Sequence, residues 1–141
     1  MRSLKIKKLT PDAQIPTKAH PGDLGFDLYA SESEVLNPDE VTLVPCGIAV
    51  QFPNGFGGII KDRSSMALRG ILTCGGVIDN GYRGPIGVLM RSVWEHGVIV
   101  SKGQKIAQIV LVSTSDSFSI EEVFEVDENV RGSRGFGSTG V

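Results

Sequence analysis

Short stretches in which apolar and polar residues alternate recur along the chain. Such alternation predicts β-strands, because successive side chains on a strand face opposite sides of its sheet. Residues 4–7 alternate in this way, and so do residues 24–30, where Asp27 falls on the polar face. Further strands are predicted over residues 41–44, 47–52, 58–61, 71–74, 88–94, 98–101, 105–112 and 118–126. About ten short strands at spacings of roughly 8 to 12 residues favour an antiparallel sandwich or barrel.

Helix signals are confined to residues 64–70, where a serine N-cap and helix formers precede Gly70. This piece predicts one helix of barely two turns. Pro45 is expected to break the strand before it, and three prolines make residues 11–21 a loop.

The pattern changes after Val126. Residues 131–141 are mostly Gly, Ser and Arg, and Phe136 is the one large aromatic side chain among them. Such a segment buries too little apolar surface to fold alone. We therefore expect a β domain over residues 1–126 and a flexible arm over residues 127–141.

Composition narrows the possible partners and compartments. The chain has 141 residues, 40% of them hydrophobic, and a net charge of −2, which predicts one domain without general affinity for nucleic acid. No signal peptide or membrane-length apolar run is visible, so we expect a cytoplasmic protein without a membrane partner. Cys46 and Cys74 lie in apolar runs and are expected to be buried thiols in a reducing cytosol. Their spacing offers no structural zinc motif.

The stretch from Gly75 to Pro85 carries the first candidate chemistry. Apolar runs at 71–74 and 86–90 flank it, which predicts a β-hairpin with Asp79 and Tyr82 at its bend. Flanking glycines would let a ligand approach the backbone closely. An ordinary hairpin with a turn-forming Asp and a surface Tyr is the alternative.

The arm and residues 63–65 offer two candidate anion sites. Arg131 and Arg134 lie among glycines whose unhindered N–H groups can bind phosphate, although an inert Gly/Ser tail is the alternative. The arm fails as a dinucleotide fingerprint, because no helix follows it, and as a P-loop, because Ser138 stands where Lys is required. An arginine and two serines at 63–65 could bind an anion or simply begin a helix. Gln108 is a polar residue in an apolar strand.

Five segments resemble, in order and spacing, the motifs of the trimeric dUTP diphosphatase family. They are PGDLGFDLY at 21–29, DRSSMA at 62–67, GVIDNGYRG at 76–84, GQKIAQ at 103–108 and RGSRGFGSTG at 131–140. Each motif alone is weak to moderate, whereas five in order across nearly the whole chain are highly specific. One departure is Gly81, where the family often has Asp.

The resemblance implies a jelly-roll-like antiparallel β-sandwich or barrel of the β-clip type, with one short helix and a C-terminal arm that closes over the site. It implies a homotrimer with three active sites, each built from all three subunits. It also implies Mg²⁺-dependent hydrolysis of dUTP to dUMP and diphosphate, which limits uracil incorporation into DNA and supplies dUMP for thymidylate synthesis.

The same resemblance implies a role for each matching residue. Asp79 would activate the water that attacks the α-phosphorus, Tyr82 would lie against the deoxyribose, and Asp27 would hold water on Mg²⁺. The other implied substrate-binding residues are Arg63, Ser64 and Ser65 for the phosphates, Gln108 for the α-phosphate, Gly76, Val77 and Ile78 for uracil, Arg131 for the γ-phosphate, and Phe136 with Gly137 and Ser138 on the arm.

Two other functions fit the same fold. The related dCTP deaminases, with or without diphosphatase activity, carry a catalytic Glu ten residues past the Asp of the third motif, and Leu89 stands there in this chain. A non-catalytic nucleotide-binding module should lack Asp79, Arg131 or Phe136, and this chain has all three.

Overall fold

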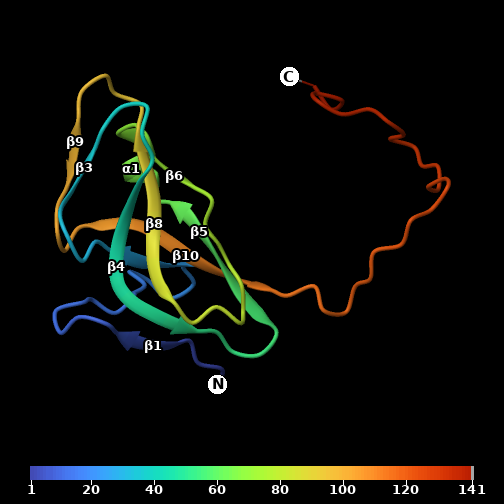
Figure 1. Cartoon of the computed structure of the whole chain (residues 1–141). Helices are drawn as coiled ribbons and strands as arrows, with labels where there is room; N and C mark the ends of the chain where they lie inside the picture. The colour runs from blue at the N-terminus through green and yellow to red at the C-terminus, as the bar shows by residue number, and fades with distance from the viewer. Residues whose placement is uncertain (141) are drawn as a thin grey trace.

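The alternating runs form strands in the computed structural model, which describes residues 1–140 (Figure 1). These residues form ten strands and one short helix. The elements are β1 (Lys5–Lys8), β2 (Gly25–Tyr29), β3 (Glu34–Leu36), β4 (Thr42–Gln51), β5 (Phe56–Asp62), α1 (Ser64–Leu68), β6 (Ile71–Cys74), β7 (Val77–Ile78), β8 (Pro85–Ser92), β9 (Val98–Val100) and β10 (Lys105–Ser113). The sequence pattern had given no signal for β3.

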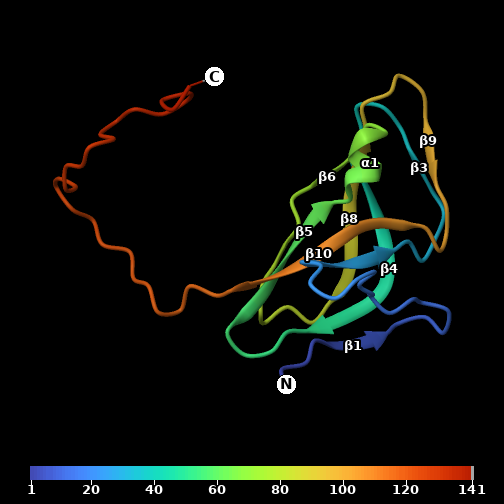
Figure 2. The same cartoon turned by 180° about the vertical axis from the view of Figure 1, so that it is seen from behind.

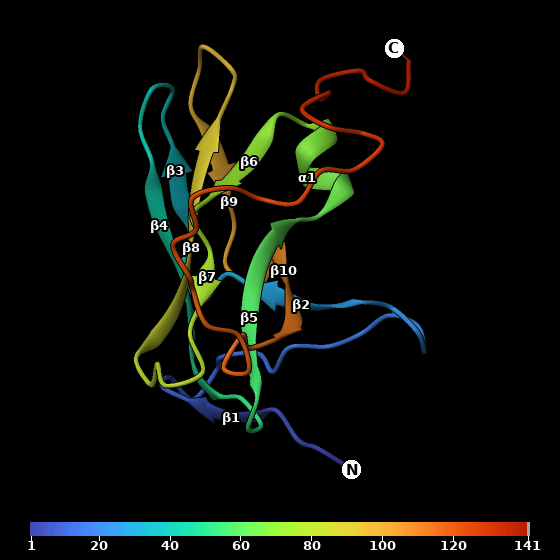
Figure 3. The ribbon, with the colours of Figure 1, turned by 90° about the vertical axis from the view of Figure 1, so that its right-hand side faces the viewer.

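Two four-stranded sheets form the body of the molecule. One has the strand order β1-β4-β8-β6, the other has the order β2-β10-β5-β7, and β3 and β9 form a separate ribbon. Figure 3 shows β4 and β8 in one layer and β2, β5 and β10 in the other. The all-β sandwich prediction is confirmed. A closed barrel is not formed, because each sheet keeps two edge strands.

The apolar core lies between the two sheets. Alternate residues of β8 point inward, so Ile86, Val88 and Met90 are at most 1% exposed while Leu89 between them faces out. Burying each such side chain contributes about 1.5–3 kcal/mol. Cys46 is part of this core, and burial raises the pKa of its thiol to about 12, which keeps it neutral. Cys74 is only half-buried, so the expectation of two buried thiols holds for Cys46 alone.

Strand β4 continues through Pro45, which corrects the expected break. Pro45 pairs with Gly87, and the register between β4 and β8 then slips before Ala49 pairs with Pro85. The Pro45 carbonyl oxygen accepts a hydrogen bond from the Ser31 N–H at 2.8 Å. A bulge of this kind accommodates the missing proline N–H while the strand goes on.

The helix α1 is formed where it was predicted, but its N-cap differs. Arg63 is the N-cap residue and makes no side-chain capping hydrogen bond, so the prediction of a serine N-cap is wrong. Gly70, at a φ of 73°, follows the C-cap as expected.

The chain leaves the sheets at Ser113, the end of β10. Figures 1 and 2 both show the following segment running away from the two sheets. The strand predicted over 118–126 is wrong, because Phe118, Ile120 and Phe124 are at least 80% exposed and no strand is present there. A strand needs a hydrogen-bonding neighbour, and this segment has none within the described part of the chain. The boundary at residue 126 between a β domain and a flexible arm stays a prediction.

No helix within residues 1–140 is long and apolar enough to cross a membrane.

Candidate active site

The predicted hairpin is formed by β6 and β8, but its bend folds over onto the other sheet. Cys74 pairs with Leu89, and the loop that follows carries β7, whose residues pair with β5. Gly76 makes this approach possible. Its φ is 96°, and an added Cβ would lie 2.9 Å from the Ile60 carbonyl oxygen. The Gly76 carbonyl oxygen accepts a hydrogen bond from the Ile60 N–H at 2.8 Å.

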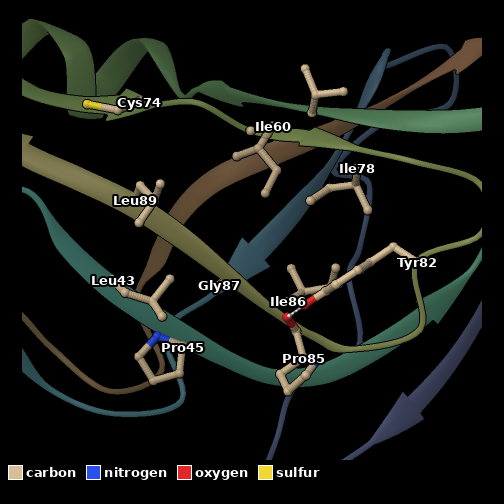
Figure 4. Close-up of a pocket in the computed structure, with 12 residues that line it drawn as sticks. Leu43, Pro45, Ile60, Cys74, Ile78, Tyr82, Pro85, Ile86, Gly87 and Leu89 are labelled. Carbon is tan, nitrogen blue, oxygen red and sulfur yellow. Dashed lines mark hydrogen bonds between the residues drawn. The ribbon is translucent and has the colours of Figure 1, made fainter.

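A cavity of about 320 Å³ lies between this loop and the outer face of β4 and β8. Figure 4 shows Tyr82 and Ile78 on one side of it and Leu43 and Leu89 on the other. Gly76 and Val77 also line it. The Tyr82 hydroxyl donates a hydrogen bond to the Pro85 carbonyl oxygen at 2.9 Å, which holds the ring at the cavity wall. The loop residues assigned to uracil and sugar therefore gather around one cavity.

Asp79 lies at the tip of the same loop. The Tyr82 N–H donates to the Asp79 carbonyl oxygen at 3.1 Å, which closes a four-residue turn. Asp79 is exposed, and it lines an adjoining hollow rather than the cavity itself. We call Gly76, Val77, Ile78, Asp79 and Tyr82 the hairpin half-site.

A second group of predicted residues gathers on β2, β5 and β10. Asp27 and Gln108 are directly opposite each other in the ladder between β2 and β10. The Arg63 Nε lies 3.2 Å from Asp27 Oδ1, and the Lys105 Nζ lies 3.1 Å from Asp27 Oδ2. The Gln108 Nε2 donates to the Asp62 carbonyl oxygen at 2.8 Å. We call Asp27, Arg63, Lys105 and Gln108 the cationic cluster.

Two cations around one carboxylate leave this cluster with a positive charge. Ser64 and Ser65 follow Arg63 at the start of α1 and are exposed, so their hydroxyl groups are free to face the same ligand. A cluster of this composition can bind phosphate through guanidinium, ammonium, amide and hydroxyl donors.

The two groups of residues lie far apart in one chain. Gly57 on β5 lies against the Asp79 turn, Lys61 is opposite Gln108, and Arg63 follows the end of β5. At about 3.3 Å per residue, Gln108 lies roughly 13 Å and Arg63 roughly 20 Å along β5 from Asp79. The strand β5 therefore separates the hairpin half-site from the cationic cluster.

The arm residues are not brought to either group. Phe136 is fully exposed, and the Arg131 Nε donates to the Arg134 carbonyl oxygen at 2.9 Å. Gly137 and Ser138 are exposed on the same segment, which Figure 1 shows away from the sheets.

Sequence reasoning missed three residues at these places. Lys105 belongs to the fourth segment, and its basic side chain near Gln108 was the available signal. The Asp62 carboxylate accepts hydrogen bonds from the Thr73 N–H at 2.7 Å and from the Thr73 hydroxyl at 2.5 Å. These bonds link the two sheets, and no local sequence pattern predicts them. Asn80 holds the Asp79 turn and reads in sequence as an ordinary turn residue.

Comparisons with known proteins agree on one family. The sequence model of the dUTPase family matches residues 11–140. The deoxyuridine 5'-triphosphate nucleotidohydrolases of Clostridium tetani and Clostridioides difficile are each 41% identical, over 98% and 99% of this chain and 97% and 99% of theirs.

Solved structures give the same result. The dUTPase of Staphylococcus bacteriophage 80alpha with dUpNHpp matches with a TM-score of 0.90 at 27% identity, over the full length of both chains. A variant dUTPase from phage phi11 of S. aureus, which coordinates a structural Mg(II) ion, has a TM-score of 0.80 at 23% identity. It matches over 89% of this chain and 99% of its own, and this second likeness supports the fold alone.

Proposed function

This chain belongs to the dUTPase family and is a hydrolase that converts dUTP to dUMP, and from that premise we propose how its residues carry out the reaction. The observation that carries the proposal is the separation of the predicted residues into a glycine-edged cavity with a carboxylate beside it and a positively charged cluster. The first group suits a nucleoside, and the second suits a polyphosphate. In a cell this activity would limit uracil incorporation into DNA and supply dUMP for thymidylate synthesis.

Asp79 is the proposed general base. Its carboxylate is exposed at the tip of the turn, where it can accept a proton from a water that attacks the α-phosphorus. Asp79→Asn keeps the shape and removes the base, so we expect dUpNHpp to bind and turnover to fall by at least about 10²-fold. Near-normal turnover of this variant would refute the assignment.

The cavity is the proposed site of the uracil and the deoxyribose. Backbone groups around Gly76 would pair with the uracil edge, and a cytosine would leave those groups unpaired, which costs about 1–3 kcal/mol for each. The Tyr82 ring, held by its bond to the Pro85 carbonyl oxygen, would contact the sugar where a 2′-hydroxyl would clash.

The cationic cluster is the proposed binding site of the phosphates. Arg63, Ser64 and Ser65 would bind the phosphate chain, with Gln108 at the α-phosphate. A magnesium ion fits this site only if a water molecule lies between the ion and Asp27. Both oxygens of Asp27 contact cations, and residues 1–140 contain no group of three His, Cys, Asp or Glu side chains suited to an ion. The ion would arrive on the triphosphate, whose charge it neutralises in part, and Asp27 would accept a hydrogen bond from its water.

The proposed active site is shared between copies of the chain. A water on Asp79 cannot reach an α-phosphate held roughly 13 Å away along β5, because attack needs contact within about 3–3.5 Å. A neighbouring copy must therefore supply the cationic cluster to each hairpin half-site. The resemblance to trimeric members of the family supports a homotrimer as the proposed assembly.

Exposed apolar surface supports this assembly. Leu43 and Leu89 are neighbours in the ladder between β4 and β8, and they are 58% and 40% exposed on the outer face of the sheet. A second copy packed on this face would bury them. The exposed apolar residues of the segment 118–126 would likewise find a partner only on another copy.

Mixing two inactive variants tests the shared site. We would unfold and refold Asp79→Asn together with Arg63→Ala in equal amounts. If Asp79 and Arg63 of one site come from different copies, the copy that supplies Asp79 has it intact in half of the sites. The copy that supplies Arg63 has it intact in half of the sites as well, so about a quarter of full activity should return. No recovery would mean that each site lies within one chain.

The arm is the proposed lid. Ordering each residue costs roughly 1–2 kcal/mol, which glycine and serine recover poorly by packing. Stacking of Phe136 on the base supplies about 1–3 kcal/mol, and Arg131 bonds to phosphate add comparable amounts. The arm should therefore close over the active site only when a triphosphate is bound, which is the behaviour of a lid.

The deaminase alternative has a specific obstacle. Leu89 stands where the deaminases carry their Glu, and its apolar side chain lines the cavity. Product analysis with dUTP, dCTP, UTP and dTTP in parallel decides between the functions. We expect dUMP and diphosphate from dUTP alone. Ammonia from dCTP would indicate a deaminase, and binding without turnover would indicate a non-catalytic module.

A further inference from the structure

The turn that carries Asp79 is fastened to the rest of the molecule by the next side chain. The Asn80 Nδ2 donates hydrogen bonds to the Pro53 carbonyl oxygen at 3.0 Å and to the Phe56 carbonyl oxygen at 2.7 Å. Pro53 lies in the turn between β4 and β5, and Phe56 is the first residue of β5. The two hydrogens of one amide group therefore tie the Asp79 turn to a segment that is distant in the sequence.

Few other bonds hold the Asp79 turn in place. Within residues 1–140 the Asp79 carboxylate makes no hydrogen bond or ion pair, and β7 has only two residues paired with β5. The Arg83 Nη1 donates to the Asn80 carbonyl oxygen at 2.6 Å, which braces the turn internally but does not tie it to another element. Loss of the Asn80 amide would leave the turn folded and free to shift against β5.

We propose that Asn80 is a positioning residue for the reaction, which holds Asp79 where its carboxylate meets the attacking water. This inference rests on the proposed role of Asp79 as the base. A base must lie within about 2.6–3.2 Å of the atom whose proton it takes, and a displacement of about 1 Å can lower the rate on the order of 10²-fold. Asparagine suits the position because its amide supplies the two donors that the two carbonyl oxygens require.

A series at this position separates positioning from simple folding. Asn80→Ala removes both donors, Asn80→Ser keeps one, and Asn80→Asp places a carboxylate against the two carbonyl oxygens. Asn54→Ala is the matched control, because Asn54 is exposed on the same β4–β5 turn and its side chain makes no hydrogen bond within residues 1–140. The measurements are kcat and KM for dUTP, the Kd for dUpNHpp, and the melting temperature.

For Asn80→Ala we expect kcat to fall about 10- to 100-fold, with KM and the Kd for dUpNHpp within about threefold. Asn80→Ser should fall between Asn80→Ala and the unchanged protein, and Asn54→Ala should match the unchanged protein. Asn80→Asp should lower kcat at least as far as Asn80→Ala, because its carboxylate cannot donate to the two carbonyl oxygens.

Two results would overturn the proposal. One is a kcat for Asn80→Ala within about twofold of normal, and the other is a loss of dUpNHpp binding as large as the loss of kcat/KM. If Asn80→Ala melts below the assay temperature, Asn80→Ser decides, and normal turnover of its folded fraction refutes positioning. An active Asp79→Asn variant would refute the base itself. An inactive Asp79→Asn beside a normal Asn80→Ala would refute only this inference.

Discussion

A methyl group at Gly25 should disturb the proposed phosphate site through Gln108, although Gly25 has no side chain to bind a ligand. Gly25 is buried on β2, and an added Cβ would lie 2.9 Å from both the Cβ and the Cδ of Gln108. Because the Cβ of Gln108 is fixed to the backbone, β10 has to shift away from β2 at this point, and the Gln108 side chain has to turn away as well. It loses the hydrogen bond that its Nε2 donates to the Asp62 carbonyl oxygen at 2.8 Å, and its amide no longer faces the cationic cluster.

The size of the effect follows from three contributions. Loss of the neutral hydrogen bond costs about 1 kcal/mol, and a displaced rotamer costs about 1 kcal/mol. Replacing Gly by Ala within a strand returns about 0.5–1 kcal/mol. Gly25→Ala should therefore lower the free energy of unfolding by at least about 1–1.5 kcal/mol. In a Gln108→Gly background both the Cβ and the Cδ are gone, and the same change should raise the free energy of unfolding by about 0.5–1 kcal/mol.

Urea denaturation of Gly25→Ala, Gln108→Gly and the double variant measures this coupling, at one protein concentration because the proposed assembly would contribute to stability. The expected coupling free energy is at least about 2 kcal/mol. In parallel, kcat/KM of Gly25→Ala should fall to the level of Gln108→Gly and no lower in the double variant. If Gly25→Ala costs the same stability in both backgrounds, Gln108 is not the residue through which it acts.

Four further changes test other parts of the site. Gly76→Ala should lower the melting temperature, because a Cβ would lie 2.9 Å from the Ile60 carbonyl oxygen at a φ of 96°. Gly81→Ala faces open space, so it should stabilise by about 0.4–1 kcal/mol, and a destabilised Gly81→Ala would contradict this. Tyr82→Ala should raise UTP turnover relative to dUTP, and an unchanged ratio would remove Tyr82 as the sugar gate. Deleting residues 132–141 should leave the melting temperature nearly intact and remove most of kcat/KM, whereas full activity would show the arm to be inert.

Alternation along the chain was enough to locate most strands and the residues that face each other across them. Asp27 and Gln108 were found separately in sequence, and the ladder between β2 and β10 puts them opposite each other. The pattern works here because the two sheets bury one face each, so the period of two is visible. The alternation did not predict that β4 continues past Pro45, because a bulge is set by the partner strand rather than by local sequence.

Contacts between distant segments were beyond the reach of the sequence. The ion pairs of Asp27 with Arg63 and Lys105 depend on the register of three strands, and Asn80 binds a turn more than twenty residues earlier in the chain. The strand predicted over residues 118–126 failed for a related reason. Its alternation is real, but strand formation requires a partner edge that one chain does not place beside it.

The strand β5 is the reason why the proposed active site cannot be completed within one chain, although that chain carries all five matching segments. Its hydrogen bonds to β10 run from Phe56 to Asp62, so the strand behaves as a rigid spacer between Asp79 at one end and Arg63 at the other. Closing a gap of roughly 20 Å within one chain would require breaking that ladder, which the buried core on its inner face opposes. In the proposed assembly, a second copy alongside would break no ladder and would bury the exposed Leu43 and Leu89. The same rigidity that keeps the two groups apart in one chain would fix the position of each group relative to its counterpart on a neighbouring copy.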